Sequence, residues 1–188
     1  MIIVYGGTFN PPTVAHRKIA EVVVKGFNPN KFILLPVGDR YTWKDQFVPF
    51  EHRFNMLKLL FNEDIFEVSD LENIDEYKGT YQSLKTIKDT YKSNVYFLLG
   101  ADNLDYLDQW INYEKLVSEF RFIVLSRSNL DVHAIVNEKF PNYQSHFQLI
   151  NIDLNISASD FRENPDNHEF IPNVVYSYLK KHQLYGVK

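Results

Sequence analysis

The chain has 188 residues, of which 45% are hydrophobic and 23% charged, so it is long enough for one domain with a sizeable buried core. Its formal net charge of −4 excludes a broad nucleic-acid-binding face, because binding to a phosphate backbone needs an excess of Lys and Arg. The absence of cysteine excludes disulfides and thiolate metal sites. Neither a secretory signal nor an apolar run of roughly 20 residues is present, so we expect a cytoplasmic protein without a membrane partner.

Strands and helices are expected to alternate along the chain. Short runs of β-branched and aromatic residues predict strands at 1–5, 31–38, 65–68, 94–100, 121–127 and 147–152. Apolar residues at helical spacing predict helices after residue 13 and at 51–61, 81–91, 130–140 and 171–184. This alternation indicates an α/β protein, a single domain over 1–188 with a doubly wound parallel sheet, whose ligands bind at the carboxyl ends of the strands.

A glycine turn and a helix start follow the first strand. Gly6 and Gly7 interrupt the strand, the prolines at 11–12 prevent regular structure, and Thr13 is suited to cap the next helix. Such a segment gathers free backbone N–H groups and the positive end of a helix dipole, which together favour a phosphate. We expect His16, one turn into the helix, to point toward the same place. The alternative is an ordinary Gly-Pro loop before an ordinary helix.

Three further segments carry residues suited to a nucleotide. Asp102 follows the strand at 94–100, where a carboxylate can hold ribose hydroxyls, and its alternative role is a plain helix cap. Trp110 offers an aromatic face for a flat heterocycle, or fills the core. The segment 156–162 combines two hydroxyls with Arg162, which suits a triphosphate, and its alternative is a capped surface helix. The loop at 39–50 has no apolar periodicity and a length typical of a mobile lid.

The spacing of these segments resembles the nucleotidyltransferase superfamily. Residues 6–16 are similar to its G-x-F-x-P-x-(H/T)-x-x-H signature, with Thr13 in the place of the commoner His and Ala15 in the place of Gly. Residues 156–162 are similar to its I-S-S-T-x-x-R element, which grips the triphosphate of ATP. Residues 100–110 are similar to the G-A-D-N-L-x-x-L-x-x-W order of the bacterial nicotinate-nucleotide adenylyltransferases in particular.

This resemblance implies a Rossmann-like nucleotidyltransferase fold and a specific reaction. The adenylyl group of ATP would pass to nicotinate mononucleotide, giving deamido-NAD and pyrophosphate in NAD biosynthesis. The displacement would be in line and direct, without a covalent intermediate, because the phosphate of the acceptor is already a nucleophile. Mg²⁺ would arrive with ATP and need few protein ligands.

The resemblance also implies site residues. The catalytic residues would be His16, Thr13, Arg162 and Lys44, whose alternative is a solvated loop lysine. The ATP site would comprise His16 with Gly6, Gly7, Thr8, Phe9, Gly100, Asp102, Ile156, Ser157, Ser159 and Arg162. The acceptor site would comprise Thr8, Asn10, Lys44, Thr80, Tyr81, Trp110 and Arg127, of which the segment 80–84 only partly matches the S-Y-T element of the family.

Several alternatives remain open on the sequence. The nearest is the same chemistry on nicotinamide mononucleotide. A cytidylyltransferase or a pantetheine-phosphate adenylyltransferase would not explain residues 102–110 or the closing helix. A nucleotide-binding module without catalysis is the alternative from another class, kept open by Thr13 and Ala15. We expect the acidic residues at 70–76, Asp70, Glu72, Asp75 and Glu76, to form a solvated face.

Overall fold

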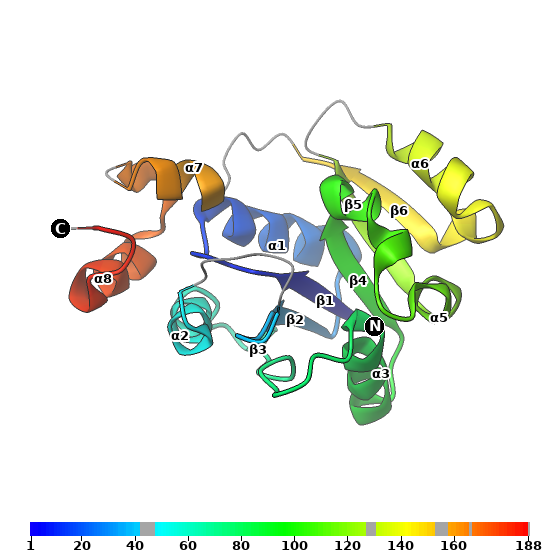
Figure 1. The fold of residues 1–188 in the computed structure, drawn as a ribbon, viewed down its shortest axis with the longest axis horizontal. Helices are drawn as coiled ribbons and strands as arrows, with labels where there is room; N and C mark the ends of the chain where they lie inside the picture. Colours follow the sequence, from blue (N-terminus) through cyan, green and yellow to red (C-terminus); the bar gives the residue numbers. More distant parts are fainter. Residues whose placement is uncertain (42–47, 127–130, 153–157, 166, 188) are drawn as a thin grey trace.

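The computed structural model describes residues 1–41, 48–126, 131–152, 158–165 and 167–187, and its centre is one parallel sheet (Figure 1). The sheet has six strands in the order β3-β2-β1-β4-β5-β6. Their bounds are β1 Ile2–Gly7, β2 Lys31–Pro36, β3 Phe66–Val68, β4 Val95–Gly100, β5 Arg121–Ser126 and β6 Phe147–Asn151. The five pairings are all parallel, so the predicted doubly wound α/β fold is confirmed.

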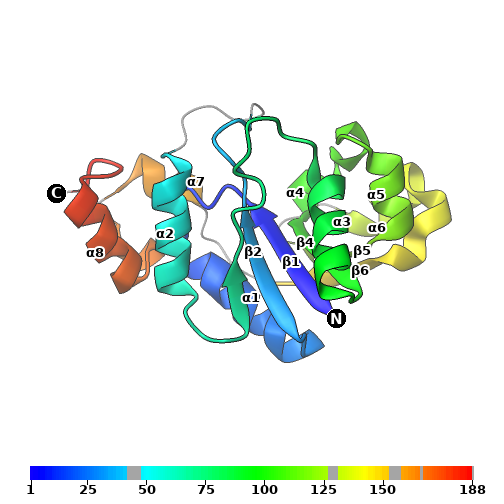
Figure 2. The same cartoon turned by 90° about the horizontal axis from the view of Figure 1, so that it is seen from below.

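Helices cover both faces of the sheet (Figure 2). One face carries α1 Val14–Phe27, α2 Phe50–Leu60, α7 Ala158–Glu163 and α8 Asn173–His182. The other carries α3 Thr80–Tyr91, α5 Tyr113–Glu119 and α6 Val132–Lys139, with the four-residue helix α4 Ala101–Leu104 directly after β4. Short 3-10 turns lie at Leu107–Gln109, Pro141–His146 and His168–Phe170. No helix within the described ranges is long and apolar enough to cross a membrane.

The strands are apolar throughout because both faces of the sheet are buried. Along β1, Ile2 and Val4 pack on the side of α3 and α5, whereas Ile3 and Tyr5 pack on the side of α1 and α2. The first three of these side chains are at most 2% exposed and Tyr5 is 5% exposed. Burying one such aliphatic side chain contributes about 1.5–3 kcal/mol before the cost of chain ordering. Two hydrophobic cores thus hold β1 in the middle of the molecule.

The predicted strands and long helices are all present, with ends that differ by a few residues. Phe50 begins α2 rather than ending the loop before it, and the closing helix spans Asn173–His182 instead of 171–184. Of the predicted lid, 42–47 lie outside the described residues. The helix α5 is absent from our prediction, because its seven residues, with Leu116 and Val117 buried, span too little chain to establish a period.

The order of the strands determines where a ligand can bind. β1 and β4 are neighbours, yet β1 leads into α1 on one face and β4 leads toward α5 on the other. The chain therefore diverges at the carboxyl ends of these two strands and leaves a crevice there. Ligands of doubly wound sheets bind in this crevice.

Candidate active site

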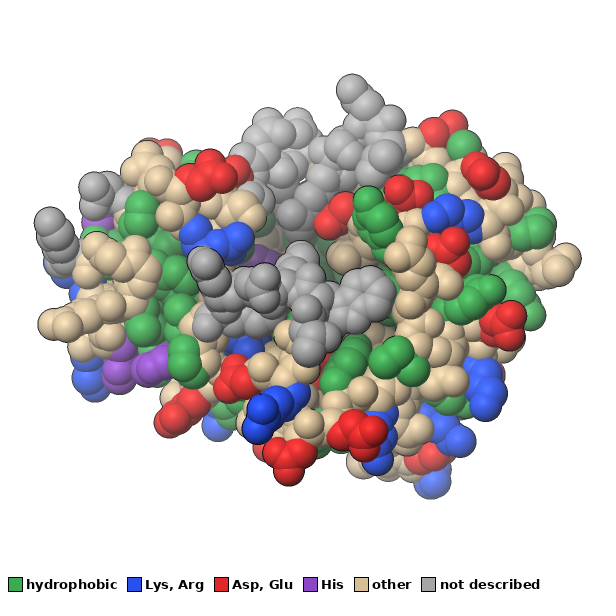
Figure 3. Space-filling view, in the orientation of Figure 1, with side chains coloured by type: hydrophobic (Ala, Val, Ile, Leu, Met, Phe, Trp, Pro, Cys, Tyr) green, Lys and Arg blue, Asp and Glu red, His purple; other side chains and the backbone are tan. Residues whose placement is uncertain are grey.

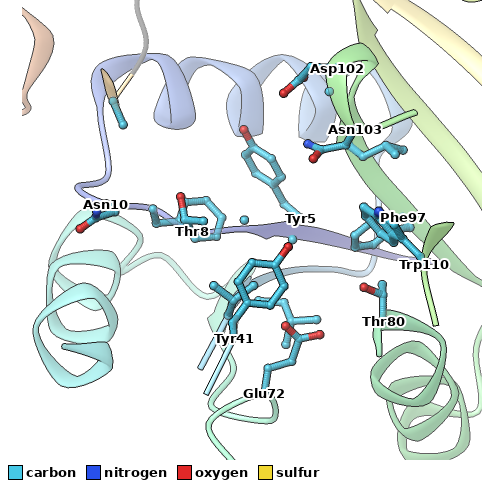
Figure 4. Close-up of a pocket in the computed structure, with 18 of the residues that line it drawn as sticks. Tyr5, Thr8, Asn10, Tyr41, Glu72, Thr80, Phe97, Asp102, Asn103 and Trp110 are labelled. Atoms are coloured by element: carbon cyan, nitrogen blue, oxygen red, sulfur yellow. The ribbon is translucent and has the colours of Figure 1, made fainter. Parts of the chain in front are cut away.

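A cavity of about 550 Å³ lies at the carboxyl ends of β1, β2 and β4 (Figure 4). Its lining combines the segment after β1, the start of α3, the segment after β4, and α7: Gly6, Gly7, Thr8, Phe9, Asn10, His16, Gly79, Thr80, Gly100, Asp102, Trp110, Ser159 and Arg162 are among its residues. His16 and Arg162, which come from opposite ends of the sequence, thus share one cavity. The three motifs identified in the sequence meet here.

His16 is held by the residue that caps its helix. The Thr13 N–H donates to His16 Nδ1 at 3.0 Å, and the Thr13 hydroxyl lies 2.8 Å from the same nitrogen. Because a backbone N–H can only donate, Nδ1 is the acceptor, and in a neutral imidazole the proton is then on Nε2. The predicted N-cap at Thr13 is confirmed, and the ring reaches back to form a capping box. His16 therefore presents an N–H donor at the cavity.

The turn beneath His16 has an unusual backbone. Phe9 has a positive φ of 47° although it is not glycine, a conformation that costs about 1 kcal/mol and is concentrated at functional sites. Its ring is 1% exposed and packs 5.1 Å from the His16 ring and 5.3 Å from the Tyr5 ring. These ring contacts offset the cost of the backbone conformation and hold the turn in place beneath the cavity.

Two glycines allow close contacts at the cavity floor, one with the neighbouring strand and one with α4. A Cβ on Gly6 would lie 2.7 Å from the Phe97 ring on β4. A Cβ on Gly100 would lie 2.3 Å from the Asp102 carboxylate, which is exposed in the first turn of α4. Asp102 makes no capping hydrogen bond from its side chain to α4, so the plain-cap alternative for this residue is not supported. Both glycines keep the floor open.

Arg162 connects the C-terminal motif to the first one. Its guanidinium donates to the Asn10 carbonyl at 2.7 Å and to the Ser159 hydroxyl at 2.8 Å. The Asn10 side chain in turn accepts from the Val48 N–H at 3.2 Å and from the Tyr185 hydroxyl. Asn10 is only 3% exposed, so it joins α7, the loop before α2 and the C-terminal segment at the cavity edge.

The end of the cavity near α3 is apolar and aromatic. Trp110 and Phe97 meet edge to face with ring centroids 6.1 Å apart. Ile111 packs closely on Gly79, the residue that precedes α3 with a φ of 86°. Thr80 begins α3 and its hydroxyl lies 3.2 Å from the Tyr77 hydroxyl. A flat ring on Trp110 would thus have its edge near the N-terminus of α3.

Glu72 corrects our prediction of a solvated acidic face. Its neighbours Asp70, Asp75 and Glu76 are exposed, but Glu72 is 4% exposed and lines the cavity. The Ser83 hydroxyl donates to its Oε1 at 2.9 Å. Burial raises the pKa of the Glu72 carboxyl to about 7, against the smaller opposite effect of the Ser83 bond. The only sequence feature that pointed to a role for Glu72 in the cavity is its position four residues after β3, near the carboxyl edge of the sheet.

Arg53 of α2 holds the loops around the cavity, a role that the sequence did not indicate. It is fully buried and donates to the carbonyls of Val48, Thr8 and Val37 at 2.8, 3.0 and 2.8 Å, and to Asp39 at 3.2 Å. These acceptors lie on both sides of the segment 42–47 and on the turn after β1. One side chain thus ties the first motif to the ends of the neighbouring loop.

Not every predicted site residue lines the cavity. Thr13 is fully buried and reaches the cavity only through His16. The Tyr81 side chain packs in the core and its hydroxyl donates to Glu119 at 2.9 Å, so only the backbone of Tyr81 remains available for a ligand. Four predicted residues, Lys44, Arg127, Ile156 and Ser157, lie outside the described residues. The lining residues that our prediction did not include are Tyr5, Leu35, Val37, Tyr41, Glu72, Tyr77, Gly79, Phe97, Leu99, Asn103, Ile111 and Ala158.

The cavity offers little for a metal ion held by protein alone. Within the described ranges, no three His, Asp or Glu side chains come together as metal ligands. The carboxylates at the cavity come from separate parts of the chain, Asp102 from α4 and Glu72 from the loop between β3 and α3. On the face in Figure 3, acidic and basic side chains are interspersed rather than gathered by sign. This donor set suits a divalent ion that arrives already bound to phosphate oxygens.

Comparison with known proteins agrees with the geometry. The family model described as cytidylyltransferase-like matches residues 4–164. A relative from Acholeplasma laidlawii, named "Probable nicotinate-nucleotide adenylyltransferase", is 34% identical, with 98% of this chain and 97% of the relative aligned. A relative of the same name from Fusobacterium nucleatum is also 34% identical, over 96% of this chain and 95% of its own length.

Solved structures extend the similarity to three dimensions. Plasmodium falciparum nicotinic acid mononucleotide adenylyltransferase, complexed with NaAD, superposes with a TM-score of 0.83 at 28% identity, covering 100% of this chain and 98% of that one. The same enzyme complexed with APC gives a TM-score of 0.81 with the same identity and coverage. The chain belongs to the cytidylyltransferase-like family and, within it, to the nicotinate-nucleotide adenylyltransferases.

Proposed function

We propose that the chain transfers the adenylyl group of ATP to nicotinate mononucleotide, forming deamido-NAD and pyrophosphate for NAD biosynthesis. One observation carries the proposal: a single cavity is lined by His16 and Arg162 at one end and by Trp110 at the other. Residues suited to a phosphate and an aromatic side chain suited to a flat ring thereby line one continuous cavity of about 550 Å³. Membership of the family supports the same reaction.

In this proposal the 5′-phosphate of the acceptor attacks the α-phosphorus of ATP while the bond to the β-phosphate breaks, and pyrophosphate leaves on the opposite side. His16 Nε2–H donates to a nonbridging oxygen of the α-phosphate, where negative charge increases in the transition state. The turn from Gly6 to Phe9 supplies backbone N–H groups to the same phosphate. Thr13 is a positioning residue, since its contacts with Nδ1 leave the donor on Nε2.

The outgoing pyrophosphate is assigned to α7 and to the loop after β2. Arg162 and Ser159 lie together at the cavity and provide a guanidinium and a hydroxyl for its oxygens. Lys44, Ser157 and Ile156 retain their predicted roles at the triphosphate, as does Arg127 at the acceptor. Gly100 and Asp102 hold the ribose of the adenosine half. Mg²⁺ bound to ATP neutralises phosphate charge in this scheme.

The acceptor ring is assigned to the aromatic end of the cavity. Trp110 stacks on the pyridine ring, and the first backbone N–H groups of α3, at Thr80 and Tyr81, meet the carboxylate of the ring. Thr8 and Asn10 bind the mononucleotide phosphate side. We further infer that the whole chain over 1–188 acts as one domain and that it works in the cytoplasm, where ATP and pyridine mononucleotides occur.

The test is a reaction of the purified chain with ATP, Mg²⁺ and nicotinate mononucleotide, in which both deamido-NAD and pyrophosphate are measured. We expect the two products in equal amounts. Parallel reactions with nicotinamide mononucleotide and with CTP in place of ATP distinguish the alternatives. Higher turnover on the amide would assign the other acceptor, and higher turnover with CTP would make the chain a cytidylyltransferase. Nucleotide binding without pyrophosphate release would leave only a binding module.

A further inference from the structure

Glu72 is a buried acid that the proposed reaction does not use. It is 4% exposed, lines the cavity, and has a hydrogen bond to Oε1 from the Ser83 hydroxyl at 2.9 Å. Figure 4 shows its carboxyl pointing up into the cavity between Tyr41 and Thr80. A carboxyl buried only for stability would be costly, because removing a carboxylate from water opposes folding. Its orientation instead suggests a ligand.

The position of Glu72 relates it to the ring of the acceptor. Ser83, the hydrogen-bond partner of Glu72, lies in the first turn of α3, three residues after Thr80. Gly79, immediately before α3, contacts Ile111, which follows Trp110. Glu72, the start of α3 and Trp110 therefore enclose the same end of the cavity. A ring stacked on Trp110 has its edge, and any substituent on that edge, toward the helix start and Glu72.

We propose that Glu72, in its protonated form, donates a hydrogen bond to the carboxylate of the acceptor's pyridine ring and so determines the preference for the acid over the amide. This inference rests on the proposed function. A protonated carboxyl has the required groups: its carbonyl oxygen accepts from Ser83, and its O–H donates to the ligand. Two carboxylates in one water-poor site cannot both remain ionised, so the proton stays between them.

The surroundings of Glu72 favour the protonated form. Tyr41 and Tyr77, from the loops before and after it, meet edge to face 5.5 Å apart and line the same cavity. Burial raises the pKa of the Tyr77 hydroxyl, and an ionised Glu72 raises it further. The same two causes raise the pKa of Tyr41, so both phenols stay neutral. In the described part of the chain no Lys, Arg or His pairs with Glu72. The titratable cavity residues Asp102, Arg162 and His16 belong to the ATP end. Burial thus leaves the Glu72 pKa near 7, and a bound carboxylate raises it further.

A measurable consequence is proton uptake on binding. Above pH 7 the free protein carries Glu72 mostly ionised, so a ligand with a ring carboxylate must bind together with one proton from solvent. The amide analogue has no such charge and needs no proton. Affinity for the acid should therefore fall up to about tenfold for each pH unit above 7, whereas affinity for the amide should stay constant.

The experiment is calorimetric titration of the full chain with deamido-NAD and with NAD, at pH 5.5 and pH 8, in buffers of different ionisation enthalpy. These two ligands differ only in the ring carboxylate or amide. We expect close to one proton taken up with deamido-NAD at pH 8, almost none at pH 5.5, and none with NAD at either pH. In Glu72→Gln, which can still donate but cannot titrate, the uptake at pH 8 should disappear.

Glu76→Gln is the matched control, because it removes the same charge from an exposed position of the same segment and should leave proton uptake unchanged. Uptake that persists in Glu72→Gln, or that is equal for deamido-NAD and NAD, overturns the role of Glu72 while the proposed function stands. No binding of deamido-NAD at all overturns the proposed function and this inference with it.

Discussion

At the scale of single residues, the site depends on pairs in which one side chain fixes another. Thr13 caps α1 and at the same time holds His16 Nδ1, so the helix start and the proposed catalytic donor form one structure. Ser83 fixes one oxygen of Glu72 in the same manner. Replacing His16 or Glu72 therefore tests the chemistry of the site, whereas replacing Thr13 or Ser83 tests how these side chains are positioned.

His16→Ala should lower kcat by about 10²-fold or more, because it removes a hydrogen bond to the α-phosphate that becomes stronger in the transition state. His16→Gln should lose less activity, since its amide N–H can reach toward the position of Nε2. The measurement is steady-state turnover with saturating ATP and nicotinate mononucleotide. His182→Gln, at an exposed position on α8, is the control and should keep wild-type turnover. Near-normal kcat in His16→Ala would remove this residue from the mechanism.

Glu72→Gln should make the protein more stable at alkaline pH. The folded-state pKa of Glu72 is raised to about 7, above the unfolded value, so the ionised form opposes folding. This destabilisation is absent below about pH 4.5, grows as the pH rises toward 7, and is then constant. We expect Glu72→Gln to raise the free energy of unfolding at pH 8 by up to about 3 kcal/mol, and by much less at pH 5. Urea denaturation at both pH values measures it; an equal effect at pH 5 and 8 would contradict the shift.

At the scale of secondary-structure elements, α2 has a role beyond covering the sheet. Met56, Leu57 and Leu60 pack into the core on one face of this helix. Arg53, one turn before Leu57, extends the same face toward the carboxyl end of the sheet. It bonds three carbonyls, one from the turn after β1 and two from the ends of the connection between β2 and α2. The hydrophobic face of α2 thus positions a buried cation that holds the cavity rim together.

Arg53→Met should destabilise the fold by about 3 kcal/mol or more, because three buried or partly buried carbonyls and Asp39 lose their partner while the volume is roughly kept. Urea denaturation with the same slope in both proteins gives the difference. Lys58→Met is the matched control on the same helix, exposed, and should change stability by about 0.5 kcal/mol or less. An equally small effect of Arg53→Met would show that the loops do not need this side chain.

At the scale of the whole molecule, the sequence was sufficient to predict the sheet and the segments that line the end of the cavity proposed for ATP. β1, β4 and β5 contain continuous apolar runs, a pattern typical of strands that are buried on both faces. Glycine marks the ends of β1 and β4. The first motif was readable because Gly6, Thr13 and His16 act within one local segment. Local patterns of this kind survive in a single sequence.

The acceptor end was less readable, because its residues are brought together only by tertiary packing. Glu72 stands among exposed acidic residues, and nothing local distinguishes it from Glu76. Tyr81 matched a family element in sequence, but helical phase turns its side chain into the core against Glu119. Arg53 carries no local sign of burial either. A charged residue in a polar segment acquires its role from distant neighbours, so the pattern of the segment cannot reveal it.

The joined cavity predicts how ligands stabilise the molecule. In the proposed binding mode deamido-NAD contacts both ends, whereas ATP and nicotinate mononucleotide each contact one, so at equal concentration the dinucleotide should raise Tm most. At about 100 times its Kd, mass action adds about 2.7 kcal/mol, which is a shift of roughly 5–10 °C for a chain of this size. Thermal denaturation with each ligand measures this. Trp110→Ala and Arg162→Gln should each reduce the shift produced by deamido-NAD, because they lie at opposite ends of the cavity. Should only one of them reduce it, the dinucleotide does not span the two ends.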